Sequence, residues 1–238
     1  MFLCVLHVAP LQAAEVDARS GWWRREDATL AAVLLTTAGL SLVADRNIRD
    51  ELQRSRHGSL DTISEGFNSL GSPQATLAMG GLLYAWGRFG ENAYRAETGK
   101  LALQSVLAAQ VATVALKYGS GRLRPGPGAE ADDFRPFEFE DGHDSLPSGH
   151  TAGAFALASV LSQRTADRRY AYLYYGLASL VGMSRVYQDD HWTSDVLLGA
   201  LIGELSGRLA LRAANKGDSS LVLRPVSGGV GLELAWLW

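Results

Sequence analysis

The sequence predicts an all-α protein, a bundle of about six helices with a short β-hairpin at its C-terminal end. Helices are favoured because the apolar runs are roughly a dozen to seventeen residues long, rich in Ala and Leu, and free of internal proline. A chain of 238 residues with 47% hydrophobic content is also long enough to bury one sizeable core. We therefore expect one helical domain, residues 21–216, followed by a small tail, residues 217–238.

The predicted helices follow one another as apolar runs separated by polar or glycine-containing breaks, and each run is expected to form one helix of the bundle. The polar segment DRNIRDELQRSRHGSLD, which follows the first run, is either helical or linking. The runs cover residues 28–44, 75–87, 101–116, 151–163, 170–183 and 195–211.

Residues 1–20 contain a short apolar run followed by Gln12-Ala13-Ala14, which resembles a secretory signal with a small-residue cleavage site. No Lys or Arg precedes this run, so an uncleaved N-terminal segment fits the sequence as well. The single cysteine, Cys4, excludes an intramolecular disulfide.

The apolar runs bear on whether the chain inserts into a membrane. A spanning helix needs about 20 predominantly apolar residues, whereas most of these runs are shorter, and Glu204 and Arg208 interrupt the last one. The first run is uncharged, however, and Trp22 and Trp23 precede it as in an interfacial belt. We expect a compact bundle in the cell envelope, peripheral or partly embedded rather than fully spanning.

The C-terminal tail differs from the rest of the chain because its apolar residues alternate with a period of two. Gly228-Gly229 is suited to the turn of a hairpin. The tail predicts a small β appendage packed on the bundle, and a membrane-contacting or partner-binding edge is the alternative. The alternating residues are Val230, Leu232, Leu234, Trp236 and Trp238.

Charge excludes one class of partner. The net charge of -3 gives no general electrostatic reason to bind nucleic acid, for which a basic face would be expected. Any site for a phosphate group must therefore be a local cluster of cations.

The segment DSLPSGHTAGAFALASVL begins as a turn and continues as an apolar helix. A helix start presents backbone N–H groups and partial positive charge, so it favours an anion at Ser148 and Gly149, with His150 in the first turn. Ser148 acting simply as a helix cap is the alternative for this segment taken alone.

Two further segments carry charged side chains at the edges of apolar runs. In KYGSGRLRPGPG, Lys117 and Arg124 can converge on one anion, and Pro125 prevents the helix from continuing. In SRVYQDDHWTSDVLLGA, His191 and Asp195 are four residues apart, which on a helix places them on one face and lets the carboxylate orient the imidazole.

Asp189 and Asp190 stand beside His191 in the same segment. Two carboxylates at this position either raise the pKa of His191 or face solvent. We expect them to face solvent.

In this order, Lys-x6-Arg-Pro, Pro-Ser-Gly-His and Ser-Arg-x5-His-x3-Asp resemble the signature of the type 2 phosphatidic acid phosphatase (PAP2) superfamily. That family also includes the bacterial class A acid phosphatases and the vanadium haloperoxidases. The signature spans residues 117–195, and the resemblance in helix layout reaches from Ala28 to Leu211. Every core position is present: Lys117, Arg124, Pro125, Pro147, Ser148, Gly149, His150, Ser184, Arg185, His191 and Asp195.

The resemblance implies a chloroperoxidase-like helical fold and a phosphatase that forms a phosphohistidine. His191 would be the nucleophile, Asp195 would fix its tautomer, and His150 would protonate the leaving group. No cofactor is implied and no metal is expected, because the cations of the site would repel a metal ion. The phosphate-binding positions would be Lys117, Arg124, Ser148, Gly149 and Arg185.

The implied substrate is a phosphorylated lipid, such as phosphatidate or polyprenyl diphosphate, met at a membrane surface with the site on the periplasmic side of a bacterial envelope. The nearest alternative is a soluble periplasmic acid phosphatase acting on small phosphomonoesters. A vanadate-dependent haloperoxidase and a non-catalytic binder of lipid headgroups are the remaining alternatives. No obligate protein partner is inferred.

Overall fold

The structure of the protein, a computed structural model, describes residues 24–138 and 142–215. This part of the chain forms seven α-helices and no β-strand, so the all-α prediction is confirmed. The predicted hairpin and the predicted export segment lie outside the described residues. The helices are α1 (Arg25–Arg54), α2 (Gly58–Gly71), α3 (Pro73–Phe89), α4 (Ala93–Ser120), α5 (Gly149–Gln163), α6 (Arg168–Tyr187) and α7 (Thr193–Asn215).

The prediction of about six helices did not include α2 as a separate helix. The polar segment after the first apolar run contains the end of α1, a short break at residues 55–57 and the beginning of α2. Several helices also extend beyond their apolar runs: α1 has 30 residues and α4 has 28. An apolar run marks only the part of a helix that is shielded from water. Straight-chain charged residues can extend the same helix because their helix propensity is high.

Short polar side chains define where several helices begin. Ser72, Asn92 and Asp167 each accept a hydrogen bond from a backbone N–H in the first turn of α3, α4 and α6, at 3.2, 2.9 and 2.9 Å. Each bond satisfies a donor that has no partner within its own helix.

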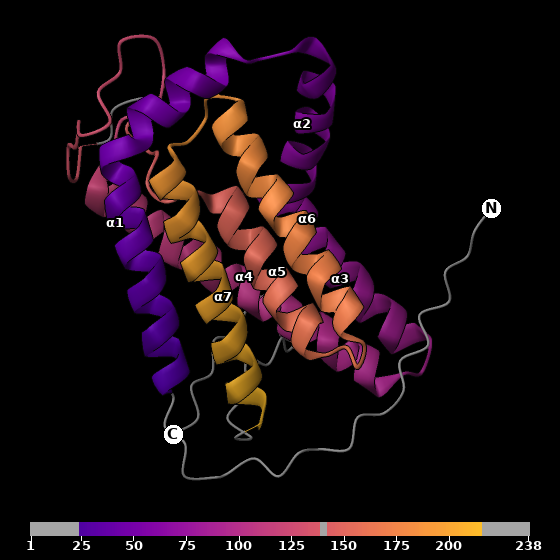
Figure 1. The fold of residues 1–238 in the computed structure, drawn as a ribbon. Helices are drawn as coiled ribbons and strands as arrows, with labels where there is room; N and C mark the ends of the chain where they lie inside the picture. Colours follow the sequence, from indigo (N-terminus) through magenta and orange to yellow (C-terminus); the bar gives the residue numbers. More distant parts are fainter. Residues whose placement is uncertain (1–23, 139–141, 216–238) are drawn as a thin grey trace, which may run out of the picture.

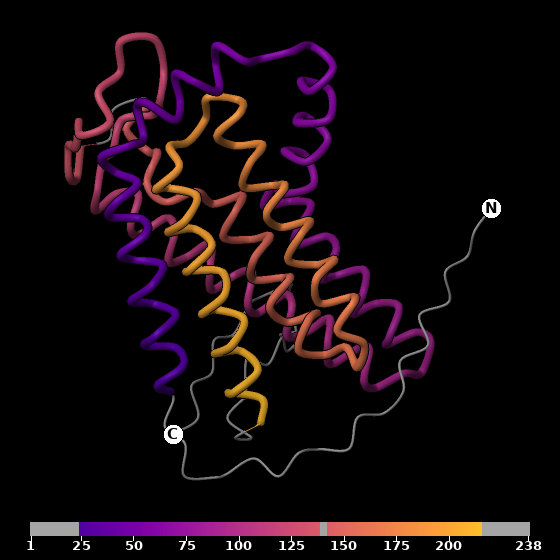
Figure 2. The backbone as a smooth tube through the Cα atoms, viewed as in Figure 1, coloured from indigo at the N-terminus to yellow at the C-terminus, as the bar shows by residue number. Residues whose placement is uncertain are grey.

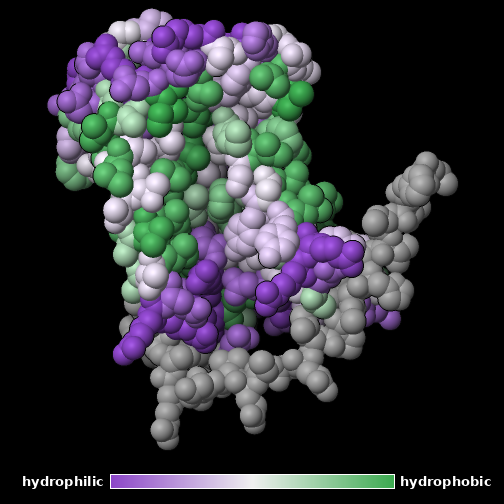
Figure 3. All heavy atoms as spheres, in the orientation of Figure 1, coloured by the Kyte–Doolittle hydropathy of each residue, from purple (hydrophilic) through white to green (hydrophobic). Residues whose placement is uncertain are grey.

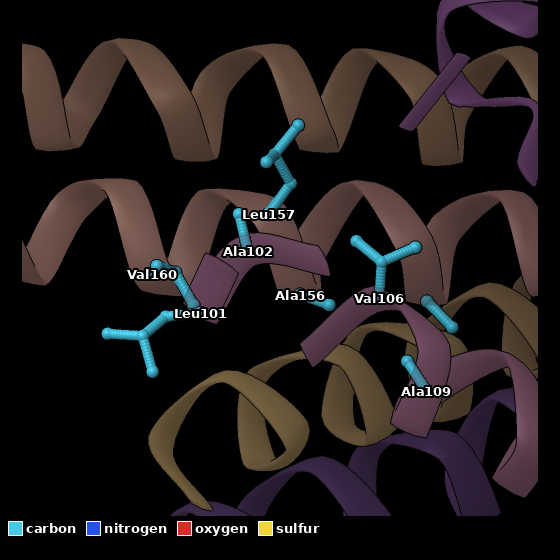
Figure 4. Packing of buried hydrophobic residues seen from close by; sticks show 8 residues of the cluster. Leu101, Ala102, Val106, Ala109, Ala156, Leu157 and Val160 are labelled. Carbon is cyan, nitrogen blue, oxygen red and sulfur yellow. The ribbon is translucent and has the colours of Figure 1, made fainter. Parts of the chain in front are cut away.

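The core is centred on α5, which packs against α4, α6 and α7. Figure 4 shows Leu101 and Val106 of α4 beside Leu157 and Val160 of α5, with alanines filling the space between the helices. The α5–α7 contact is closer still. A Cβ atom at Gly203 would lie 2.3 Å from a carbonyl oxygen of α5, so only glycine permits this approach.

Most connections between the described helices lie at the two ends of the bundle (Figures 1 and 2). We call the end that holds residues 121–138, residues 142–148 and the α6–α7 turn, residues 188–192, the loop end. At the opposite end α1 begins and α7 finishes. α1 runs beside α7 over the length of the bundle and then turns across the loop end towards α2 (Figure 2).

The side of the bundle carries an apolar belt of exposed side chains, with charged residues gathered above and below it on the face that Figure 3 shows. α1 and α4 are long enough and apolar enough to cross a membrane. Together these features indicate association with a membrane. The belt includes Leu40, Val43, Leu82, Val111, Leu173 and Met183.

Candidate active site

The three sequence motifs, although far apart in the chain, meet at the loop end. The Ser148 N–H donates to the carbonyl of Asp195 at 3.0 Å, and the Ser145 N–H donates to the carbonyl of Arg122 at 3.0 Å. These backbone bonds join the start of α5 to α7 on one side and to the chain that follows α4 on the other. The convergence expected from the sequence is therefore present in the fold.

A single glycine turns the chain at the end of α4. Gly121 ends the helix with φ at +54°, in the left-handed region. A Cβ atom at this position would lie 1.8 Å from the carbonyl oxygen of Arg135, so no other residue fits. The turn sends Arg122 towards the buried start of α7 and Arg124 towards the loop before α5.

The start of α5 combines the two predicted roles of Ser148. Its side chain caps the helix, because its oxygen accepts hydrogen bonds from the Thr151 N–H at 3.5 Å and the Thr151 hydroxyl at 2.9 Å. A hydroxyl that accepts two bonds still has one proton to donate. Together with the first N–H groups of the helix, Ser148 can therefore serve both as cap and as anion ligand.

His191 is buried and lies in the turn before α7, so the pair with Asp195 does not need both residues to be on the helix. Its Nδ1 is 3.7 Å from Asp195 Oδ2, because the third residue of a helix points its side chain back over the helix start. The distance is longer than a hydrogen bond, as is common in catalytic pairs without substrate. The Trp192 N–H and the Ser145 hydroxyl hold the same carboxylate oxygen at 2.9 and 2.5 Å.

His150 and His191 are both neutral at neutral pH. Burial lowers the pKa of His191 to about 4, although the carboxylate of Asp195 acts in the opposite direction. Burial also lowers the pKa of His150 to about 3, and the positive charges of Arg185, Lys117 and Arg124 lower it further. A neutral His191 is competent as a nucleophile, whereas His150 needs a bound anion nearby before it can hold a proton.

Two of the predicted cations meet on one internal carboxylate. Arg124 donates to both oxygens of Asp144, at 2.6 and 2.8 Å, and Lys117 Nζ lies 3.6 Å from Oδ2 while donating to the Asp144 carbonyl. The bonds from Arg124 hold the pKa of Asp144 well below its usual range. Lys117 and Arg124 thus converge on an anion, and in this structure that anion is a side chain of the protein.

The third predicted cation, Arg185, is paired in a similar way. Its Nη1 lies 2.9 Å from Asp190 Oδ2 and also donates to Asn68 of α2, whereas its buried Nε has no hydrogen-bond partner among the described residues. The same Asp190 approaches Arg124 to 4.0 Å. A donor of Arg185 therefore remains available to a ligand.

The prediction that Asp189 and Asp190 face solvent is wrong. Asp189 adopts φ of +64° and accepts two bonds from Arg49 of α1, at 2.7 and 2.5 Å, while Asp190 pairs with Arg185. The tight turn before His191 points the two carboxylates at arginines of different helices, which a linear sequence does not show.

Sequence reasoning missed three residues that contact the site: Arg122, Asp45 and Asn68. Arg122 and Asp45 are fully buried, and Arg122 donates to both Asp45 and Asp195. Two signals pointed to them: an additional arginine between Lys117 and Arg124, and a lone carboxylate directly after the uncharged run of α1. Nothing in the sequence distinguishes Asn68 from other polar residues of α2.

The structure defines an all-α protein in which two histidines, three cations and a helix start gather at one end of the helical bundle. The family model of the PAP2 superfamily matches residues 99–218, which is half of the chain and includes all three motifs. The chain belongs to the PAP2 superfamily, and the resemblance read from the motifs is confirmed.

Two relatives and one solved structure extend this result. Lipid A 1-phosphatase of Porphyromonas gingivalis is 34% identical over 181 residues, which are 74% of this chain and 36% of that protein. Lipid phosphate phosphatase 1 of Arabidopsis thaliana is 34% identical over 140 residues, 46% of this chain and 42% of that protein. The match with this chain thus spans less than half the length of either relative.

The solved structure is the crystal structure of the first transmembrane PAP2 type phosphatidylglycerolphosphate phosphatase from Bacillus subtilis. It superposes with a TM-score of 0.66 and covers 83% of this chain and 100% of that chain. The two chains are 24% identical, so the likeness establishes a common fold.

Proposed function

We propose that this protein is a metal-independent phosphomonoesterase that acts on lipid phosphates through a phosphohistidine intermediate. The observation that carries the proposal is the position of His191, backed by Asp195, next to three cations and the start of α5. The names of the two relatives, both lipid phosphatases, support the substrate class.

In the first step, the substrate phosphate replaces Asp144 and Asp190 on the three cations, which bind its non-bridging oxygens with Ser148 and the Gly149 N–H. His191 Nε2 attacks phosphorus in line, so the N–P bond forms as the bond to the leaving oxygen breaks. Asp195 stabilises the positive charge that develops on the imidazole.

In this first step the bound phosphate neutralises the cations that depress the pKa of His150, so this histidine can gain a proton and deliver it to the leaving oxygen as the P–O bond breaks. In the second step, water replaces the departed alcohol. The neutral His150 takes a proton from this water, whose oxygen attacks phosphorus as the N–P bond breaks. Inorganic phosphate and free His191 result.

Metal ions are not needed for this chemistry. Lys117, Arg124 and Arg185 supply the positive charge that a magnesium ion supplies in other phosphoryl-transfer sites, and they repel a metal from the same pocket. Full activity after exhaustive chelation is the expected result.

The apolar belt supports a lipid substrate. We propose that the belt contacts the hydrocarbon of a bilayer and that the loop end lies at the headgroup level, where a phosphorylated lipid presents its phosphate. The position of the loop end on the periplasmic side of a bacterial envelope remains a prediction.

The test is an assay of the purified protein in detergent against long-chain lipid phosphates and soluble phosphomonoesters, in parallel with His191→Ala. We expect the wild type to prefer lipid phosphates and His191→Ala to form no phosphoenzyme. Equal turnover of soluble esters without detergent would favour the nonspecific acid phosphatase. An inactive wild type, or an active His191→Ala, would overturn the proposal.

A further inference from the structure

Arg122 occupies an unusual environment behind the site. Its guanidinium is fully buried between the rings of Phe134 and Trp192, with 5.4 and 5.5 Å to their centroids. It donates to Asp45 Oδ2 at 2.8 Å and to Asp195 Oδ1 at 2.5 Å. One arginine thus joins two buried carboxylates, and we call Asp45, Arg122 and Asp195 the buried triad.

Asp45 brings α1 into this cluster. Besides Arg122, its carboxylate accepts bonds from the Ser194 N–H at 3.0 Å and the Ser194 hydroxyl at 2.5 Å, so it holds the start of α7 directly. Asp45 lies outside residues 99–218, which the family model matches, and outside all three motifs.

The charges of the buried triad bear directly on His191. Arg122 paired with Asp195 alone would be neutral and would do little to stabilise a positive charge on the imidazole. Asp45 adds a second carboxylate, so the buried triad itself carries an excess of one negative charge, and none of its three side chains is exposed. Arg122 binds Oδ1 of Asp195, whereas Oδ2, which also accepts the bonds from Trp192 and Ser145, is the oxygen nearest His191 Nδ1, at 3.7 Å.

A link that served only to join α1 to α7 would not need these charges. Buried ion pairs can often be replaced by apolar side chains of similar volume without loss of stability. Three buried charges beside a nucleophile are therefore better explained by the charge that forms on His191 than by packing.

We propose that Asp45 and Arg122 are positioning residues, which together orient Asp195 and maintain the excess negative charge that stabilises the cationic His191. The inference rests on the proposed function. It extends the catalytic apparatus to α1, so that the alignment of α1 against α7 sets the strength of the nucleophile.

The test compares Asp45→Asn with Asp27→Asn in the full-length protein. Asp27 is a matched control because it is also on α1, fully buried and bonded to arginines, here Arg208 and Arg212 of α7 at the opposite end. Four quantities are measured: kcat, KM, and the inhibition constants of orthovanadate and inorganic phosphate. Vanadate imitates the transferring phosphoryl group and needs the nucleophile, whereas phosphate needs only the cations.

Both variants should lower the melting temperature, but only Asp45→Asn should affect the chemistry. We expect its kcat to fall by at least about tenfold and its vanadate inhibition constant to rise by a similar factor, with KM and phosphate inhibition nearly unchanged. A folded Asp45→Asn with the kcat and vanadate inhibition of Asp27→Asn would overturn the inference. An inactive wild type would instead overturn the proposed function.

A milder variant decides the question if Asp45→Asn does not fold. Ser194→Ala removes the hydroxyl that bridges Asp45 and Arg122, at 2.5 and 2.6 Å, but leaves all three charges in place. We expect about threefold losses in kcat and in vanadate affinity, with phosphate affinity preserved. Wild-type values for both quantities would overturn the inference.

Discussion

The two ends of the α1–α7 contact are built from the same chemistry but differ in their charge balance. At the opposite end, Arg208 and Arg212 both bind the carboxylate of Asp27, and Arg208 also binds Glu204, so two arginines face two carboxylates. The side chains of Arg208 and Arg212 are 25% and 12% exposed and so reach water. At the loop end, the single arginine Arg122 lies between two carboxylates, and neither it nor Asp45 has any exposed surface.

Burial alone therefore does not mark a functional ion pair. Asp27 and Asp45 are equally buried, and both tie α1 to the bundle. Only the buried triad at the loop end has two carboxylates for one arginine, and it lies beside a buried histidine.

The largest effect should come from the proton donor at the loop end. His150→Ala should lower kcat on alkyl phosphates by about 10² to 10⁴-fold, because their leaving oxygen needs a proton. An aryl ester such as p-nitrophenyl phosphate, whose leaving group needs none, should lose much less. Kinetics on both esters are the measurement, and equal losses would contradict the assignment of His150 as the acid.

The loop end should also be the acid-sensitive end. Because burial lowers the pKa of His191 to about 4, the unfolded chain binds a proton near pH 6.5 that the folded chain does not bind. The stability contribution is therefore present above pH 6.5 and is lost as pH falls towards 4, by about 2 kcal/mol at pH 5. The free energy of unfolding of the wild type and of His191→Gln is measured at pH 7 and at pH 5. Between these two pH values the variant should lose less stability than the wild type.

The internal anion of the site should compete with substrate. Asp144→Asn removes the charge that occupies Arg124 and Lys117, so inorganic phosphate should bind up to about tenfold more tightly. Competitive inhibition by phosphate at constant ionic strength measures the change. Unchanged or weaker inhibition would show that Asp144 helps to arrange the cations instead of competing for them.

The smallest effect is expected at the opposite end. Tyr175 donates to Glu204 at 2.7 Å, and Glu204 also binds Arg208 at 2.6 Å. Tyr175→Phe should cost about 1 kcal/mol of unfolding free energy, since the carboxylate keeps its arginine. Its kcat and KM should equal those of the wild type, and a change in kcat would contradict the separation of the two ends.

Much of the fold and of the candidate site could be predicted from the sequence. Six of the seven helices correspond to apolar runs, and all the predicted site residues lie at the loop end. The errors concern partners. Asp189 and Asp190 were expected in solvent, and the pairing of the cations with Asp144 was not foreseen, because both depend on how a short turn directs its side chains.

Helix periodicity, capping and motif spacing are local properties of the chain, so the all-α class, the three motifs and the family could be predicted from the sequence alone. Which charges face one another became evident only in the folded structure. Asp45 and Arg122 become a buried ion pair because α1 packs along α7 and because Gly121 turns the chain where α4 ends. Electrostatic interactions depend on distance in space, and neighbours from different helices have no signature along the chain.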